Sequence, residues 1–274
     1  MELAYTVVNG KIVYNDGGAV EKKMLYKVNR GDVLHFALLD TEKKYSNLTL
    51  EDIVVNLCDF GIDVLLIGGS TGVTDEGITK ITDIKERNGI DVPTIVFPRS
   101  VGDLKGRANA VLYMRCTNSR KMKYVKDEAI EGAAYLLNGN IEEIPLTYLI
   151  VEPGGMVGQI ADAQLIPRDN PKIAIMHARE AKANGSRWFY LEAGSHASPA
   201  IHEERGPELI SAVKKYVNLP LIVGGGIRSP EAVRIVKKAG ANGIVTGNII
   251  EKEDMSLMKR IIEAVHEERA PGEN

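Results

Sequence analysis

Two glycine-rich turns in the last third of the chain have the composition of a phosphate-binding site. Glycines 224–226 follow the apolar run 221–223, and Gly247 with Asn248 follows the apolar run 243–245. A phosphate needs several backbone N–H donors that converge on it, and glycine lets the backbone approach closely enough to supply them. Three glycines can also serve only to make a tight turn, but a second such turn one unit later favours a phosphate site.

Two carboxylates also end apolar runs and could take part in chemistry. Asp40 follows the run 33–39, and Ser70 lies after the next run. Together they could supply oxygen ligands to Mg²⁺, which usually binds few protein groups and keeps several waters. Asp40 could equally cap a turn. Glu192 could accept hydrogen bonds from a polyol or act as a general base, and the structural alternative is an ion pair with Arg228.

Apolar runs alternate with helix-like segments along most of the chain. Eight such runs are present, and a parallel (β/α)₈ barrel, the TIM barrel of the α/β class, explains this alternation better than an open sheet. In such a barrel the site lies at the C-terminal ends of the strands. The predicted strands are 33–39, 64–67, 94–97, 110–114, 146–151, 188–191, 221–223 and 243–245.

Three connecting segments carry more specific predictions. The connection between 94–97 and 110–114 is too short for a helix with two loops, so we expect the third helix to be missing or reduced to a turn. Residues 1–33 form an N-terminal extension packed on the barrel, with a β-hairpin about an Asn-Gly pair and a helix. We expect residues 152–170 to form a long loop without regular structure. We expect residues 34–274 to be a single catalytic barrel domain.

Composition limits the class of protein. The chain has 274 residues, 44% hydrophobic residues and a formal charge of −3, which suits one large α/β domain and not a general nucleic-acid binder. Two cysteines imply no disulfide framework, so a cytoplasmic location is expected. No signal peptide or transmembrane segment is expected, which leaves room for a peripheral contact with a membrane. We also expect a homo-oligomer.

Several motifs, in order, resemble one enzyme family. They are HFALLD, LLIGGS, the NS of TNSRK, YLIVEPGG, WFYLEAGS, VGGGIRSPE and GANGIVTGN. The chain thereby resembles the geranylgeranylglyceryl phosphate synthases and their bacterial heptaprenyl relatives over roughly 33–268. YLEAGS with TYLIVEPGG is the specific part, because many phosphate-binding barrels share the glycine turns.

The resemblance implies a Mg²⁺-dependent prenyltransferase. Its expected reaction joins the 3-hydroxyl of sn-glycerol 1-phosphate to a long prenyl diphosphate, geranylgeranyl diphosphate in the expected case, and releases diphosphate during archaeal membrane lipid synthesis. By this resemblance Asp40 and Ser70 are metal-site residues, Asp40 and Glu192 are catalytic, and the reduced third helix leaves a groove for the prenyl chain. The implied glycerol phosphate site comprises Tyr190, Leu191, Glu192, Ala193, Gly194, Ser195, His196, Gly225, Gly226, Gly247 and Asn248.

The chain departs from the family pattern at several positions. Thr41 and Glu42 replace Pro and Asp in a D-P-D-K motif, Arg99 replaces Gly in F-P-G-S, and His196 replaces Gly in YLEAGSGA. We expect Arg99 to add a contact to the diphosphate. Two alternatives remain: another phosphate-binding barrel enzyme that acts on a sugar phosphate, and a noncatalytic barrel that binds a phosphorylated ligand.

Overall fold

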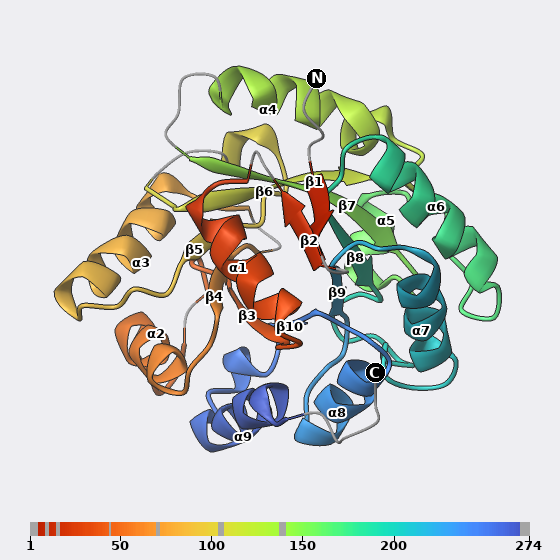
Figure 1. The fold of residues 1–274 in the computed structure, drawn as a ribbon. Helices are drawn as coiled ribbons and strands as arrows, with labels where there is room; N and C mark the ends of the chain where they lie inside the picture. Colours follow the sequence, from red (N-terminus) through yellow and green to blue (C-terminus); the bar gives the residue numbers. More distant parts are fainter. Residues whose placement is uncertain are drawn as a thin grey trace.

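The chain folds into a closed barrel of eight parallel strands, which confirms the predicted fold class (Figure 1). A computed structural model describes residues 5–8, 11–14, 17–43, 45–69, 72–103, 107–136 and 141–268. Each barrel strand pairs with the next along the chain, and the last closes on the first with Gly243 opposite Leu34. The strands are β3 (Leu34–Leu39), β4 (Val64–Ile67), β5 (Thr94–Val96), β6 (Ala110–Cys116), β7 (Glu142–Ile150), β8 (Trp188–Glu192), β9 (Leu221–Gly224) and β10 (Gly243–Thr246).

Helices surround the barrel, and several begin at a side chain that caps them. Thr49, Thr74, Ser229 and Asp254 each accept a hydrogen bond from a first-turn N–H, which fixes where α2, α3, α8 and α9 start. The helices are α1 (Ala19–Asn29), α2 (Leu50–Asp59), α3 (Asp75–Arg87), α4 (Glu128–Leu136), α5 (Gly155–Ile160), α6 (Pro171–Ala183), α7 (Gly206–Tyr216), α8 (Pro230–Lys238) and α9 (Met255–His266), with the 3₁₀ turns η1 (Val101–Asp103) and η3 (Ile250–Lys252) and the π-helical turn η2 (Lys123–Asp127).

Alternation along each strand separates the barrel interior from the helix-facing core. Leu34 and Phe36 belong to the interior cluster, whereas Ala37 and Leu39 pack in the outer cluster with the helices. On β8 the interior series is Trp188, Tyr190 and then Glu192. This period of two therefore aims a carboxylate into the C-terminal end of the barrel.

Helix α1 covers the opposite, N-terminal end of the barrel and lies in front of the strands in Figure 1. Gly18 has no side chain to cap this helix, so the carboxylate of Glu142 on β7 accepts the N–H groups of Val20 and Glu21 at 2.8 and 2.7 Å. Fully buried Glu21 in turn accepts hydrogen bonds from Trp188 Nε1 at 2.9 Å and from Arg187. Charged groups thus tie α1 to two strands.

Other predictions about the connections were confirmed or corrected. The N-terminal hairpin is present, because β1 (Tyr5–Val8) and β2 (Lys11–Tyr14) pair antiparallel. Between β5 and β6 the described residues contain only the turn η1 as regular structure. The helix that would follow the third barrel strand is therefore reduced, as expected. The prediction of a loop without regular structure over 152–170 was wrong, because that segment contains α5. Its glycines disfavour a helix, and tertiary packing overrides this preference.

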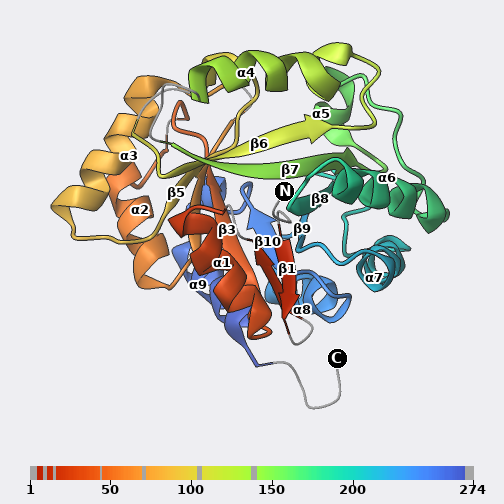
Figure 2. The ribbon, with the colours of Figure 1, turned by 45° about the horizontal axis from the view of Figure 1, so that its top comes forward.

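The elements around β6 and β7 differ from the prediction in their bounds. Strand β7 starts at Glu142 rather than at residue 146, and the first turn of the predicted helix 123–137 is the π-helical turn η2. Figure 2 shows α4 running over β6 and β7, with α5 beyond the end of β6. No helix within the described ranges is both long and apolar enough to cross a membrane.

Candidate functional site

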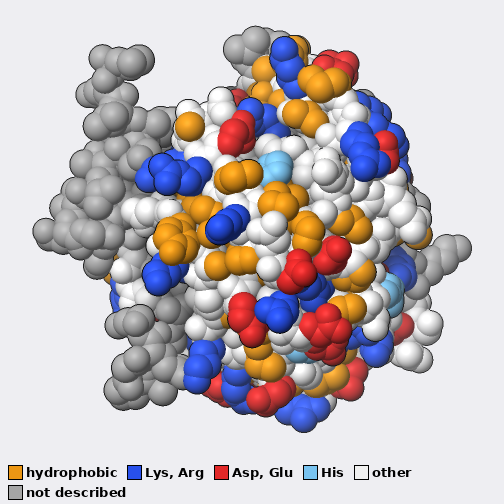
Figure 3. Space-filling model, turned by 90° about the vertical axis from the view of Figure 1, so that its right-hand side faces the viewer, with side chains coloured by type: hydrophobic (Ala, Val, Ile, Leu, Met, Phe, Trp, Pro, Cys, Tyr) orange, Lys and Arg blue, Asp and Glu red, His pale blue; other side chains and the backbone are white. Residues whose placement is uncertain are grey.

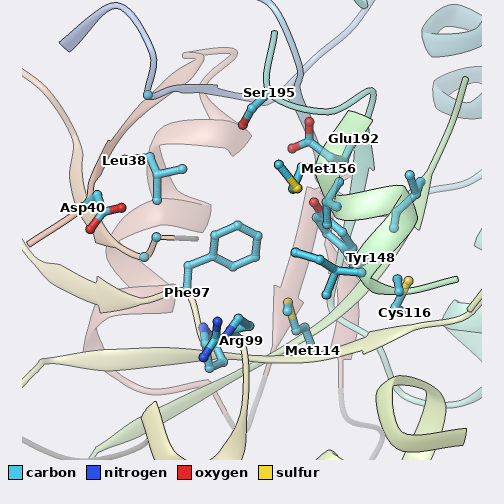
Figure 4. Close-up of a pocket in the computed structure, with 18 of the residues that line it drawn as sticks. Leu38, Asp40, Phe97, Arg99, Met114, Cys116, Tyr148, Met156, Glu192 and Ser195 are labelled. Carbon is cyan, nitrogen blue, oxygen red and sulfur yellow. The ribbon is translucent and has the colours of Figure 1, made fainter. Parts of the chain in front are cut away.

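A cavity of about 560 Å³ opens at the C-terminal end of the barrel. Figure 4 shows Asp40 and Glu192 on opposite sides of it, with the ring of Phe97 between them. The wall combines polar and apolar side chains. The polar ones include Asp40, Lys43, Arg99, Glu192, Ser195, His196, Asn248 and Glu251, and the apolar ones include Leu38, Phe97, Met114, Tyr148, Ile150, Met156, Val157, Ile160 and Ala161.

Glu192 is a buried carboxylate held in one position by hydrogen bonds. Its Oε2 accepts from the Tyr190 hydroxyl at 2.8 Å and its Oε1 accepts from the Gly194 N–H at 2.6 Å. These groups, rather than Arg228, hold the carboxylate. Burial raises the pKa of Glu192 above its ordinary value, and the hydrogen bonds from Tyr190, Gly194 and Tyr148 oppose this shift. The result is a fixed, desolvated group suited to accept a proton.

Three aromatic rings form the floor beneath Glu192. Tyr148 and Tyr190 meet edge to face with centroids 5.0 Å apart, and Phe97 stacks on Tyr190 at 5.9 Å. Burial raises the pKa of both tyrosine hydroxyls well above the usual value, so they remain donors. Sequence reasoning missed Tyr148, although its inward position two residues after Leu146 could have indicated it.

Asp40 lies at the cavity wall with one oxygen engaged in a turn. Its Oδ1 accepts from the Glu42 N–H at 3.1 Å, so the capping alternative holds for that oxygen. The carboxylate also lies against Gly69, where an added Cβ would be 2.5 Å from Oδ2. Ser70, the second predicted metal-site residue, lies outside the described residues.

The donor set suits a hard ion held mainly by its substrate. Within the described ranges no group of three His, Cys, Asp or Glu side chains could hold a metal ion. Mg²⁺ commonly binds proteins through one or two carboxylates and completes its shell with water and substrate phosphates. Asp40 at the edge of a roomy cavity fits that mode of binding.

Neighbouring charges tie the loop after β3 to the loop after β10. Lys43 pairs with Glu251, and both residues line the cavity. Glu253 accepts the backbone N–H groups of residues 46–48 at 2.6 to 2.8 Å. Glu42, the counterpart of the missing Asp, instead accepts from the Thr74 hydroxyl at 2.8 Å. This loop, which carries Asp40, is therefore anchored beside Gly247 and Asn248.

The two glycine turns have different relations to the cavity. Gly247 and Asn248 line it directly. Gly225 and Gly226 have φ values of +108° and +77° and pack against the loop after β8, where an added Cβ would lie 2.7 Å from that of Ala193 and 2.6 Å from that of Ala200. Gly225 and Gly226 therefore shape the β8–α7 loop at the rim of the cavity.

The remaining predicted site residues fall into two groups. Ser195 and His196 are exposed and line the cavity with Glu192. Leu191 on β8 and Ala193 just after it instead belong to the helix-facing core, because they alternate with the inward-facing Tyr190 and Glu192. The cavity thus gathers only part of the set that the motif suggested.

His196 occupies a backbone position that favours glycine. Its φ is +58°, and the hydrogen bond from Ala197 N–H to Gly194 carbonyl at 3.2 Å closes a turn around it. Its ring lies 3.4 Å from the amide Nδ2 of Asn248. A residue with an unfavourable backbone angle, whose exposed side chain joins two cavity-lining loops, is typical of a functional position.

The loops after β7 and β8 cross backbone to backbone at Gly194. Its φ is +98°, and an added Cβ would lie 2.7 Å from the carbonyl atoms of Gly154. Glu192 and Ser195 flank this crossing. The glycines of the EPGG and EAGS motifs are therefore required by close approach.

Arg168 was not predicted, and it holds the β8–α7 loop from below. Its side chain is 5% exposed and donates to the carbonyl of Glu152 at 2.7 Å and to those of Pro199 and Ala200 at 2.8 Å. The sequence gives little sign of this role, because all of these acceptors are backbone atoms.

Removing this clamp is expected to loosen the loop. Arg168→Met leaves several buried carbonyls without a donor, so the free energy of unfolding should fall by about 2–4 kcal/mol. Protease cleavage within 193–205 should become faster. Arg205→Met, at an exposed position in the same region, is the control and should change stability by less than about 0.5 kcal/mol. Equal effects of the two substitutions, measured by denaturant unfolding, would contradict the clamp.

Arg99 stands at the edge of the cavity next to the loop after β4. Its backbone N–H donates to Asp103 Oδ2 at 2.7 Å, and an added Cβ on Gly72 would lie 3.2 Å from Arg99 Nη2. Arg99 therefore lines the cavity beside Gly72, and its contact with a diphosphate stays a prediction. If Arg99→Gly left the KM for a prenyl diphosphate unchanged, that contact would be excluded.

Comparisons with known proteins agree on one family. The chain matches the PcrB family over residues 26–267. It is 41% identical over 234 residues to geranylgeranylglyceryl phosphate synthase of Methanosarcina barkeri, which covers 85% of this chain and 92% of that protein. It is 36% identical over 248 residues to the enzyme of the same name from Metallosphaera sedula, a match that covers 90% of this chain and 96% of that protein.

A solved structure is similar over nearly its whole length. The crystal structure of (S)-3-O-geranylgeranylglyceryl phosphate synthase from Thermoplasma acidophilum, in complex with its substrate sn-glycerol-1-phosphate, has a TM-score of 0.82 and 32% sequence identity. The match covers 91% of this chain and 99% of that chain.

Proposed function

Because the chain belongs to the PcrB family, we propose that it transfers a prenyl group from a prenyl diphosphate to the 3-hydroxyl of sn-glycerol 1-phosphate. The observation that supports this proposal is that polar side chains and a large set of apolar side chains line one cavity. A phosphorylated polyol suits the former and a long hydrocarbon suits the latter. Geranylgeranyl diphosphate is the proposed donor, since the relatives of the chain carry that name.

The polar residues of the cavity have distinct roles in the proposed reaction. Asp40, with Ser70, would hold Mg²⁺, which supplies positive charge to a diphosphate leaving group. Asn248 and the backbone at Gly247 orient the glycerol phosphate, together with Ser195 and His196. Positioning of this kind brings the acceptor hydroxyl to C1 of the donor. The new C–O bond forms as the C1–O bond to diphosphate breaks.

Glu192 takes the proton that the acceptor hydroxyl loses. Its two fixed hydrogen-bond donors orient the carboxylate, which is buried at the wall of the cavity. A general base contributes about 10²–10⁴-fold to a rate. The apolar wall formed by Phe97, Tyr148 and Val157 keeps the prenyl chain away from solvent.

Glu192 also sets an expected pH dependence. Because burial raises its pKa, the carboxylate becomes protonated at a higher pH than an ordinary carboxyl, and kcat should fall as the pH drops through that value. Glu192→Gln should lower kcat by about 100-fold and remove this acidic limb. Steady-state rates across a pH series test both points. If kcat of the Glu192→Gln variant still fell at acidic pH, a group other than Glu192 would cause the pH dependence.

A product assay tests the function itself. Purified protein is incubated with Mg²⁺, sn-glycerol 1-phosphate and prenyl diphosphates of several lengths, with sn-glycerol 3-phosphate and EDTA samples as controls. We expect a prenylglyceryl phosphate only with the 1-phosphate and the metal. If glycerol phosphate bound but no donor gave product, a binding protein or another sugar-phosphate enzyme would replace this proposal.

A further inference from the structure

The rim of the cavity continues onto an exposed surface that combines methionines with cations. We define the mouth patch as Arg120, Lys121, Met122, Lys123, Lys126 and Met156. Met156 on α5 lines the cavity and yet is 61% exposed, and Met122, just before η2, is 57% exposed. Exposed methionines that adjoin an apolar cavity indicate an interaction surface.

Hydrogen bonds hold the two parts of the mouth patch together. Lys121 Nζ donates to the carbonyl of Ile160 at 2.8 Å, and the Arg120 N–H donates to the carbonyl of Asp162 at 3.0 Å. The segment before η2 therefore lies on the C-terminal end of α5. Ile160 and Tyr124 line the cavity with Met156, so the segment that carries Met122 adjoins the same wall.

The charge of the mouth patch favours an anionic partner. The stretch 120–126 contains four cations and no carboxylate, with two carboxylates following at 127–128. Arg120 pairs with Asp162 at 3.7 Å and Lys123 with Glu128 at 3.3 Å, and both cationic side chains are more than half exposed, at 64% and 58%. Such exposed pairs are weak, so these cations can turn toward external phosphates.

An exposed methionine is also present away from the cavity. On the side that carries α6 and α7, apolar side chains are scattered among charges of both signs (Figure 3). Met176 on α6 is 63% exposed and does not line the cavity. It therefore offers a matched control.

We propose that the mouth patch docks on an anionic lipid bilayer. The methionines enter the interface while the cations contact lipid phosphates. This inference rests on the proposed function, because a prenyl diphosphate and its product both partition into membranes, and docking lets the hydrocarbon chain pass between bilayer and cavity without crossing water.

Vesicle binding tests the docking without any substrate. The full chain is floated with vesicles that contain phosphatidylglycerol and with vesicles of phosphatidylcholine alone. We expect binding to the anionic vesicles that weakens as salt is raised. The double substitution Lys123→Glu and Lys126→Glu should weaken it by about tenfold or more. Met122→Ser should weaken it severalfold, whereas Met176→Ser should leave it unchanged.

Specific results would overturn the proposal. Equal binding to both vesicle types, or wild-type binding by the charge-reversed variant, would show that the mouth patch is not the contact. A wild-type dimer in light scattering that became monomeric with Met122→Ser would identify an interface between copies of this chain instead. With a short, water-soluble prenyl diphosphate the charge-reversed variant should keep its kcat, so a failure of docking is distinguishable from a failure of the synthase function.

Discussion

Asp40→Asn is expected to lower kcat/KM for prenyl transfer by about 100-fold or more while the fold stays intact. Asn has the same shape, and its Oδ1 can still accept the Glu42 N–H, so the melting temperature should change by no more than about 2 °C. We expect the rate to fall because Asn carries no negative charge to hold Mg²⁺, so less positive charge stabilises the departing diphosphate. Rates measured over a Mg²⁺ titration should show a higher metal requirement.

Glu42→Gln is the matched control for that substitution. Glu42 lies two residues away, bonds to Thr74 and does not line the cavity. The kcat/KM of this variant should stay within about threefold of the wild-type value, since surface substitutions of this kind have small effects. If the two variants lost activity equally, the effect would belong to net charge near the loop and not to Asp40 as a ligand.

Gly194→Ala is expected to abolish most activity and to destabilise the fold strongly. A φ of +98° disfavours any side chain by about 1–3 kcal/mol. The methyl group would also lie 2.7 Å from the backbone of Gly154, and overpacking of this kind costs about 1–3 kcal/mol more. The loop after β8 must then shift, which moves Glu192 and Ser195 apart from their partners. Thermal unfolding and kcat measure the two effects.

Gly185→Ala separates the two causes. Gly185 also has a positive φ, of +84°, but no atom lies within 4 Å of an added Cβ. Its variant should show only the conformational cost and retain its kcat. A loss of stability at Gly194 no larger than that at Gly185 would mean that the crossing loops relax around the methyl group.

Much of the fold could be predicted because the barrel repeats one local pattern. Apolar runs such as 188–191, separated by helix-like segments, specify parallel strands, and the short connection after 94–97 leaves no room for a helix. Helix α5 was missed because three glycines in GGMVGQI oppose a helix locally, and only contacts such as that of Gly158 with Leu165 show why it forms.

The site was predictable where a side chain follows the strand period and less so elsewhere. Asp40 and Glu192 continue the inward series of β3 and β8, so their places at the cavity follow from alternation. The same rule places Leu191 on the helix-facing side of β8, away from the cavity. Arg168 could not be found in this way, because it recognises carbonyl groups that every residue has. The strain at His196 also required the backbone dihedral angles.

The seal that α1 forms at the closed end of the barrel bears on how such a protein can adapt to temperature. Glu21, Arg187 and Trp188 hold that end, while Asp40 and Glu192 line the cavity at the other. Substitutions that rigidify the sealed end leave the residues that line the cavity and their loops untouched. A lineage, or an engineer, could therefore adjust heat tolerance there without the loss of activity that stabilising changes near a catalytic centre commonly bring.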